Sequence, residues 1–207
     1  MRVLRFTTLL FAAFSSPLLV EDSLAQGGRF AFGFGSGSAT IWCSACRYNG
    51  NVGGTTAMFQ FNSDPTTLHL RFGVSSDWWW HSGTSPQGWD RWTITLAPSA
   101  FYYPWTVRNG FFLEAGPALV AALARVTDST ALRRHGWGFT VGVGYDVAPR
   151  WKVSLTPRLA FTYAWVGDIY YPLGSNVLFA RGWRHEVLSL GLGITLHQYA
   201  PPEADSF

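Results

Sequence analysis

Two cysteines are the first residues whose types and spacing suggest chemistry. Cys43 and Cys46 form a C-x-x-C pair and are the two cysteines of the 207-residue chain. In an exported protein, the expected state of such a pair is a local disulfide that closes a tight loop. A redox role of the thioredoxin kind would need a βαβ context, which the flanking sequence lacks. A zinc site would need two further ligands, and His81, His135 and His185 are the candidates in other predicted loops.

A histidine followed directly by a serine is the second candidate. His81 precedes Ser82, and Asp77 and Asp90 are close in sequence. A serine activated by a histidine, with a carboxylate to orient the ring, is an arrangement used for acyl transfer. Such a group would hydrolyse or transfer acyl chains. We find no enzyme-family motif around them, so this activity is an alternative to a non-enzymatic role.

A third set consists of charged residues that share a sequence face with small residues. Its members are Arg71, Glu114, Asp146, Lys152 and Arg158. If the segments that carry them are strands of a closed β-barrel, Arg71, Glu114 and Arg158 are predicted to form ion pairs across its narrow lumen, because buried charges require partners. A structural plug is the first interpretation, and a proton or ion path is the alternative, since ionisable groups within a membrane are candidates for function.

The elements that would position these residues follow from a period of two. From 136 to 147, odd positions are large and apolar, whereas even positions are Gly, Thr or Asp. Such alternation predicts β-strands, and a tilted membrane crossing needs about 9 to 11 residues. The same pattern gives eight segments: 29–40, 52–62, 66–79, 90–103, 110–122, 136–147, 152–166 and 185–197. The Ala-rich end of 110–122 would also suit a short helix.

Connections between these segments alternate between long and short, as in an up-and-down transmembrane barrel with short periplasmic turns. Side-chain volume decides which face lies outside. An eight-stranded lumen is just wide enough for side chains, so the Gly, Ser, Thr and Ala face must point inward. Only 13% of the residues are charged, too few for the surface of a soluble lipocalin-like barrel. The sequence therefore predicts an all-β, eight-stranded antiparallel transmembrane β-barrel.

Aromatic residues gather near the predicted strand ends, where transmembrane barrels carry interfacial girdles. Trp78, Trp80, Trp92, Trp137 and Trp165 fall near the long-loop ends, and Tyr103, Tyr145 and Trp151 near the short-turn ends. A Trp-rich carbohydrate-binding sandwich is the alternative explanation of this composition, because exposed aromatic patches also mark binding sites.

The first 25 residues are predicted to be a signal peptide. Arg2 and Arg5 precede an apolar stretch, and Ser23-Leu24-Ala25 forms a small-x-small cleavage site. After this segment no apolar run is long enough for a transmembrane helix. We assign 26–197 to the barrel and 198–207 to a periplasmic tail. Basic residues are scattered, so nucleic acid is not an expected partner.

Several short segments between residues 30 and 197 carry a resemblance to a known family. They are Phe30-Ala31-Phe32-Gly33-Phe34-Gly35, Cys43-Ser44-Ala45-Cys46, Tyr102-Tyr103-Pro104, Gly110-Phe111-Phe112-Leu113, Gly142-Val143-Gly144-Tyr145-Asp146-Val147 and Leu190-Gly191-Leu192-Gly193-Ile194-Thr195-Leu196-His197. The chain resembles the small outer-membrane β-barrel family of the OmpA and OmpX type. Such barrels typically end at the last strand, whereas here 198–207 follow it.

The resemblance implies an outer-membrane monomer with extracellular loops and periplasmic termini. Its expected partners are outer-membrane lipid and the barrel insertion machinery, for which the last strand looks like a β-signal, and no cofactor or metal is expected. We predict a non-enzymatic protein whose extracellular loops mediate surface interaction, with an unidentified ligand, or support envelope integrity. A rim-sited lipid A enzyme and a narrow pore are the alternatives.

Overall fold

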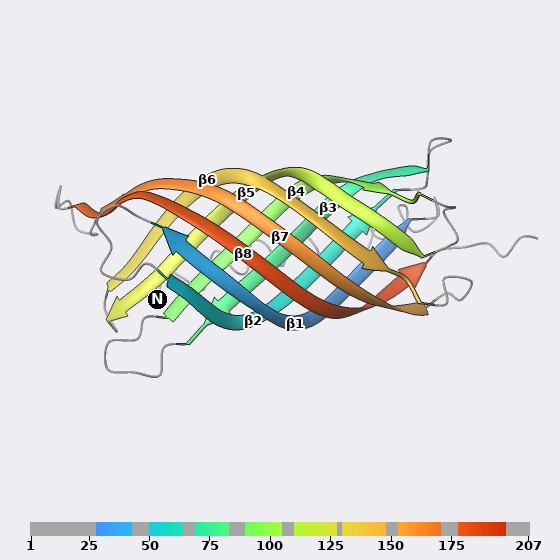
Figure 1. Cartoon of the computed structure of the whole chain (residues 1–207), viewed down its shortest axis with the longest axis horizontal. Helices are drawn as coiled ribbons and strands as arrows, with labels where there is room; N and C mark the ends of the chain where they lie inside the picture. Colours follow the sequence, from blue (N-terminus) through green and yellow to red (C-terminus); the bar gives the residue numbers. More distant parts are fainter. Residues whose placement is uncertain are drawn as a thin grey trace, which may run out of the picture.

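The computed structural model describes residues 28–42, 50–63, 69–82, 90–104, 110–127, 130–147, 153–170 and 178–197. They form a closed ring of eight antiparallel strands that follow one another in chain order (Figure 1). The strands are β1 (Arg29–Trp42), β2 (Gly50–Asn62), β3 (Leu70–His81), β4 (Asp90–Tyr102), β5 (Phe111–Thr127), β6 (Thr130–Tyr145), β7 (Val153–Tyr170) and β8 (Leu178–His197). The predicted all-β, eight-stranded up-and-down barrel is confirmed. Within the described ranges, no helix is long and apolar enough to cross a membrane.

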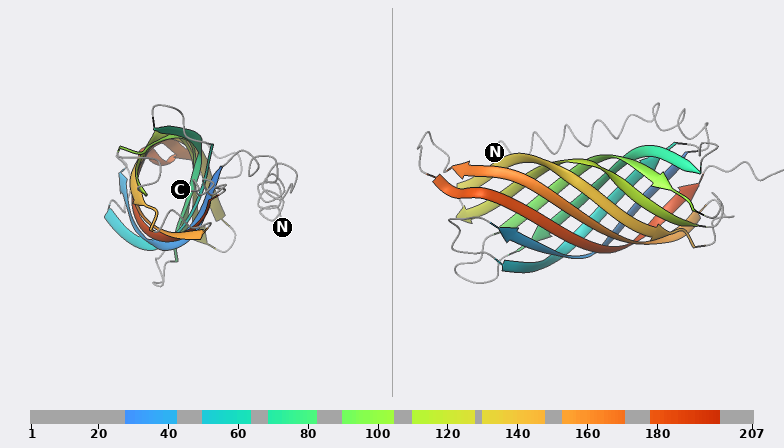
Figure 2. Two further views of the ribbon diagram at one scale, coloured as in Figure 1. Left: turned by 90° about the vertical axis from the view of Figure 1, so that its right-hand side faces the viewer. Right: turned by 45° about the horizontal axis from the view of Figure 1, so that its top comes forward.

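The strands are tilted, and the tilt sets which residues share a level in the lumen. Arg29 pairs with Asn62 on β2, and the pairing followed from strand to strand returns to β1 at Ala39. Such a stagger is the geometric requirement for closing a sheet into a barrel. Figure 2 shows the closed ring end-on and the inclined strands from the side. Inward-facing residues far apart in sequence therefore meet across the lumen.

Alternating burial divides each strand into a lumen face and an outer face. On β7, Thr156, Arg158 and Ala160 are buried, whereas Leu155 and Leu159 are exposed. The other strands repeat this pattern with exposed Phe, Leu, Val and Trp residues outside. A water-facing barrel would place polar side chains there, so the apolar exterior is the surface of a protein that spans a lipid bilayer.

Several strands are longer than the sequence pattern predicts. β5 and β6 remain paired up to Thr127 and Thr130, and β7 and β8 up to Tyr170 and Leu178. The long connections predicted at 123–135 and 167–184 are therefore mostly strand, and the Ala-rich end of β5 is not helical. The alternation fails at these ends because both pairings shift register, β5–β6 between Arg125 and Thr127 and β7–β8 near Gly167 with its positive φ of 82°.

Two hairpins diverge at the end of the barrel where β1 ends. β6 and β7 pair only up to Trp137 and Trp165, although both strands continue beyond these residues. Hairpins β5–β6 and β7–β8 each stay paired within themselves, and both extend past the ends of β1 and β2 (Figure 1). We call these two hairpins the fork, this side the fork end, and the opposite side, with Arg29 and His197, the terminal end.

Large aromatic side chains also occupy the lumen near the terminal end. Phe101, Tyr103 and Phe112 form a buried cluster, and Gly144 makes room for it, because a Cβ there would lie 2.3 Å from the Phe112 ring. The prediction that Tyr103 belongs to the outer girdle is wrong. Tyr102 is exposed, and the alternation that turns Tyr102 outward turns its neighbour inward. The lumen face is thus not restricted to small residues.

Candidate functional site

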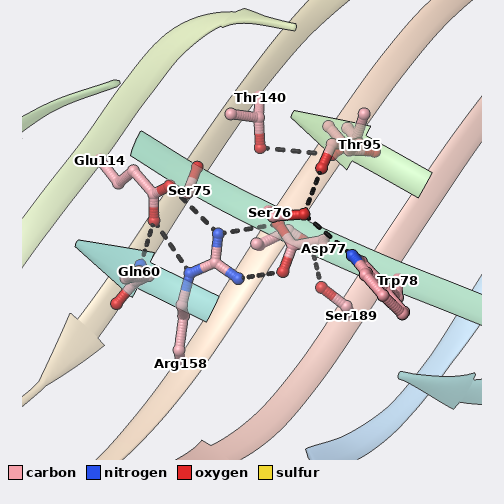
Figure 3. A network of polar contacts seen from close by, with 12 residues as sticks. Gln60, Ser75, Ser76, Asp77, Trp78, Thr95, Glu114, Thr140, Arg158 and Ser189 are labelled. Carbon is pink, nitrogen blue, oxygen red and sulfur yellow. Dashed lines mark hydrogen bonds and ion pairs between the residues drawn. The ribbon is translucent and has the colours of Figure 1, made fainter. Parts of the chain in front are cut away.

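The centre of the lumen holds an arginine between two carboxylates. Arg158 Nε donates a hydrogen bond to Glu114 Oε2 at 2.9 Å, and its Nη2 lies 3.2 Å from Glu114 Oε1. On the other side of the guanidinium, Nη1 and Nη2 contact the two oxygens of Asp77 at 2.5 and 3.0 Å (Figure 3). Paired contacts of this kind are the strongest arginine–carboxylate arrangement. One guanidinium therefore joins β7 to both β5 and β3.

A glutamine extends these contacts toward the terminal end. Gln60 Nε2 donates to Glu114 Oε2 at 2.8 Å, while its Oε1 accepts from Arg29 Nη1 at 3.1 Å. Arg29 in turn contacts both oxygens of Asp146, at 2.6 and 2.9 Å. Thr156 Oγ1 also donates to Asp146, at 2.6 Å. We call Asp77, Arg158, Glu114, Gln60, Arg29 and Asp146 the luminal network.

Strand alternation and a small neighbour explain how these long side chains fit. Each member is buried; five of them lie at inward positions of strands, and Asp146 directly follows β6. Gly142 on β6 lies beside Glu114, and a Cβ at this position would be 3.3 Å from Glu114 Oε2. A larger residue there would crowd the carboxylate. The glycine therefore leaves the width that the central ion pairs require.

Among the residues that the structure describes, the buried arginines and carboxylates of the lumen balance in charge. Arg29, Arg158 and Arg71 supply three positive charges, and Asp77, Glu114 and Asp146 supply three negative ones. Arg71 lies over the ring of Tyr103, with its guanidinium carbon 5.2 Å from the ring centroid. Buried charges are tolerated when paired and hydrogen-bonded, and breaking such a pair is costly. Chemically, this arrangement cross-links the barrel wall.

The structure brings some of the predicted luminal residues together and places others elsewhere. Glu114 and Arg158 are in contact, whereas Arg71 lies against Tyr103 and Asp146 binds Arg29. Lys152 lies outside the described residues. Sequence reasoning missed Arg29, Gln60 and Asp77 as members. The alternation in the first three strands could have found them, since all three share the inward face with small or polar residues.

The residues considered for acyl chemistry do not form a catalytic group. Asp77 points into the lumen against Arg158, while His81 Nδ1 lies 2.7 Å from the Gly53 carbonyl oxygen. Ser82 is exposed, and within the described ranges no side-chain hydrogen bond joins it to His81 or Asp90. The geometry therefore supplies no serine–histidine–carboxylate arrangement at this position.

The histidines considered as zinc ligands are also separated. His135 is exposed on β6, whereas His185 is buried beside Trp79 and its Nδ1 lies 2.9 Å from Thr93 Oγ1. In the part of the chain that the structure describes, no three His, Cys, Asp or Glu side chains are grouped to hold a metal ion. Cys43 and Cys46 lie outside the described residues.

The predicted girdle residues mostly lie on the outer face. Trp137, Trp165 and Tyr145 are exposed, and Trp78, Trp80 and Trp92 are partly exposed. Trp78 Nε1 donates to Ser76 Oγ at 3.0 Å, which satisfies its polar atom beside the apolar surface. Trp151 lies outside the described residues.

Solved structures similar to the chain include that of Neisserial surface protein A. It aligns with a TM-score of 0.51 and 19% identity, over 81% of this chain and 96% of that chain. The chain has the fold of the eight-stranded outer-membrane β-barrels. Ail of Yersinia pestis aligns with a TM-score of 0.45 and 9% identity, over 82% and 99% of the two chains. OprG of Pseudomonas aeruginosa gives 0.43 and 13%, over 83% and 97%. No protein-family model and no curated protein sequence matches the chain.

Proposed function

We propose that this barrel is a non-enzymatic outer-membrane protein that presents the fork to the cell exterior for surface interaction. The observation that carries the proposal is that the exterior, the lumen and the fork differ in chemistry and in extent. The exterior is apolar, the ion pairs of the luminal network cross-link the lumen, and among the described strands only those of the fork extend past the others at this end. A surface that extends beyond the membrane is available to meet partners outside the cell.

The topology supports this orientation. β1 begins and β8 ends at the terminal end, where Arg29 pairs with His197. In outer-membrane barrels the short turns lie in the periplasm and the longer connections outside. With the terminal end in the periplasm, the fork reaches the exterior. Free backbone groups along the diverging edges of β6 and β7 would suit an extended segment of a partner.

A shortened fork tests the proposal. In the variant, an Asn-Gly turn replaces residues 124–132, so that the paired residues Leu123 and Arg133 flank the turn and β5 and β6 stay in register as a tight hairpin. Cells that display the full-length or the shortened barrel are then compared on an array of immobilised proteins and polysaccharides. We expect the full-length barrel to retain cells on at least one surface and the shortened barrel to lose this retention.

Detergent sensitivity of the same cells separates the proposal from a role in envelope integrity. We expect both strains to resist sodium dodecyl sulfate equally, because the shortened barrel keeps its membrane-spanning part. Equal retention of both strains on every surface, with increased detergent sensitivity of the shortened strain, would instead assign the protein to envelope integrity. The amount of folded barrel in the membrane must match between the strains.

A further inference from the structure

Four outward-facing side chains lie in one hydrogen-bonded row near the fork end. Trp137 on β6 pairs with Trp165 on β7, which pairs with Arg184 on β8, which pairs with Trp42 on β1. All four residues are exposed. The ring centroids of Trp137 and Trp165 are 4.9 Å apart. An arginine therefore lies between tryptophans on the outer wall of a membrane-spanning barrel.

Because the strands are tilted, the row climbs toward the fork end from Trp137 on β6 to Trp42 on β1, and it crosses the upper boundary of the apolar exterior. Toward the membrane centre, the same outer faces carry Phe139, Tyr163 and Leu188, whereas toward the fork end β6 presents the exposed His135. Tryptophan concentrates at the level where lipid headgroups meet acyl chains, because its ring is apolar and its N–H is polar. Arg184 thus lies at headgroup level.

Arg184 has no partner within the described ranges, where it forms neither an ion pair nor a side-chain hydrogen bond. Glu186 shares its outer face one step closer to the membrane centre, but the two side chains do not pair. A guanidinium has a planar fork of donors that fits a phosphate group, and basic residues at a membrane surface attract anionic headgroups. Arg184 is therefore available to bind an anionic group from outside the chain.

We propose that Trp42, Trp137, Trp165 and Arg184 form a seat for one acylated, phosphate-bearing lipid of the outer leaflet. Arg184 donates hydrogen bonds to the lipid phosphate, and the tryptophan rings pack along the adjoining acyl chains. The flanking rings favour a lipid over free phosphate, because a free ion would leave their apolar surface unused. This lipid seat does not depend on any partner of the fork.

Native mass spectrometry of the full-length barrel in detergent tests the lipid seat. The barrel is titrated with lipid A, with dephosphorylated lipid A and with inorganic phosphate. The variants are Arg184→Gln, Arg184→Lys and the matched control Arg134→Gln, which removes an exposed arginine of β6 outside the row. Heat-modifiable gel mobility verifies that each variant forms the closed barrel.

We expect one saturable lipid A to bind, with an affinity that falls about fivefold in Arg184→Gln, the contribution of one arginine at a membrane surface. Arg184→Lys should lose less affinity, and Arg134→Gln should stay within twofold of the parent. Equal binding of dephosphorylated lipid A, or an unchanged affinity in Arg184→Gln, would overturn the proposal. So would an equal loss in Arg134→Gln, which would indicate diffuse charge attraction, or inorganic phosphate binding as tightly as lipid A.

Discussion

Replacing Glu114 with glutamine removes one of the two carboxylates that hold Arg158 while keeping the shape of the side chain. The parent Glu114 accepts two hydrogen bonds from Arg158 and one from Gln60. Leaving a buried charge without its partner costs about 3–5 kcal/mol. Arg158 keeps both contacts with Asp77, and the glutamine oxygen still accepts one hydrogen bond. We therefore expect the free energy of unfolding to fall by about 2–4 kcal/mol.

Urea unfolding of the barrel in lipid vesicles measures this loss. The design is a double-mutant cycle with Glu114→Gln, Asp77→Asn and the double variant, because both residues bind the same guanidinium and should couple by at least about 0.5 kcal/mol. Arg134→Gln controls for a charge removed at an exposed position and should change stability by less than about 0.5 kcal/mol. An unchanged unfolding midpoint for Glu114→Gln, or strict additivity in the cycle, would refute the view that the luminal network cross-links the wall.

Three further predictions concern the lumen and the fork. In planar bilayers the barrel should show no stable conductance step, because the luminal network crosses its width, and a persistent open channel would contradict this. Gly144→Ala should cost about 1–3 kcal/mol by overpacking against Phe112, with partial recovery on adding Phe112→Leu. Gly53→Ala, which meets open space, is its control in the same urea assay. Gly182→Ala strains a positive φ of 62° and should accelerate hydrogen exchange in the β7–β8 hairpin. The global free energy of unfolding should stay within about 1–2 kcal/mol of the parent value.

Period-two alternation was sufficient to predict the barrel. It is strongest at 136–147, where glycine and threonine inside alternate with large apolar residues outside, and the structure has β6 there. The volume argument also indicated the correct face for Arg158 and Glu114, which both point inward. These features are local, because the alternation within about a dozen consecutive residues determines both faces of a strand.

Other features depend on contacts between distant strands. Strand alternation can place Asp77 on the inward face, but its two carboxylate contacts with Arg158 become visible only when β3 and β7 face each other across the lumen. Tyr103 is of a residue type common in girdles, but its side chain packs inside the lumen against Phe101 and Phe112. The extra length of the fork comes from pairing between strands whose side-chain alternation is broken, for example at Gly167.

The ion pairs of the luminal network also act as a checkpoint on assembly. Arg29 on β1 reaches Asp146, which directly follows β6 and lies 117 residues later, and Arg158 on β7 reaches back to β3 and β5. None of these pairs joins neighbouring strands, so no isolated hairpin can neutralise its own charges. A partly assembled sheet would carry unpaired charges into the bilayer, at a high energetic cost. These charges are all paired only in the closed ring, which favours all-or-none closure. Incomplete barrels would keep unpaired charges and would be substrates for degradation.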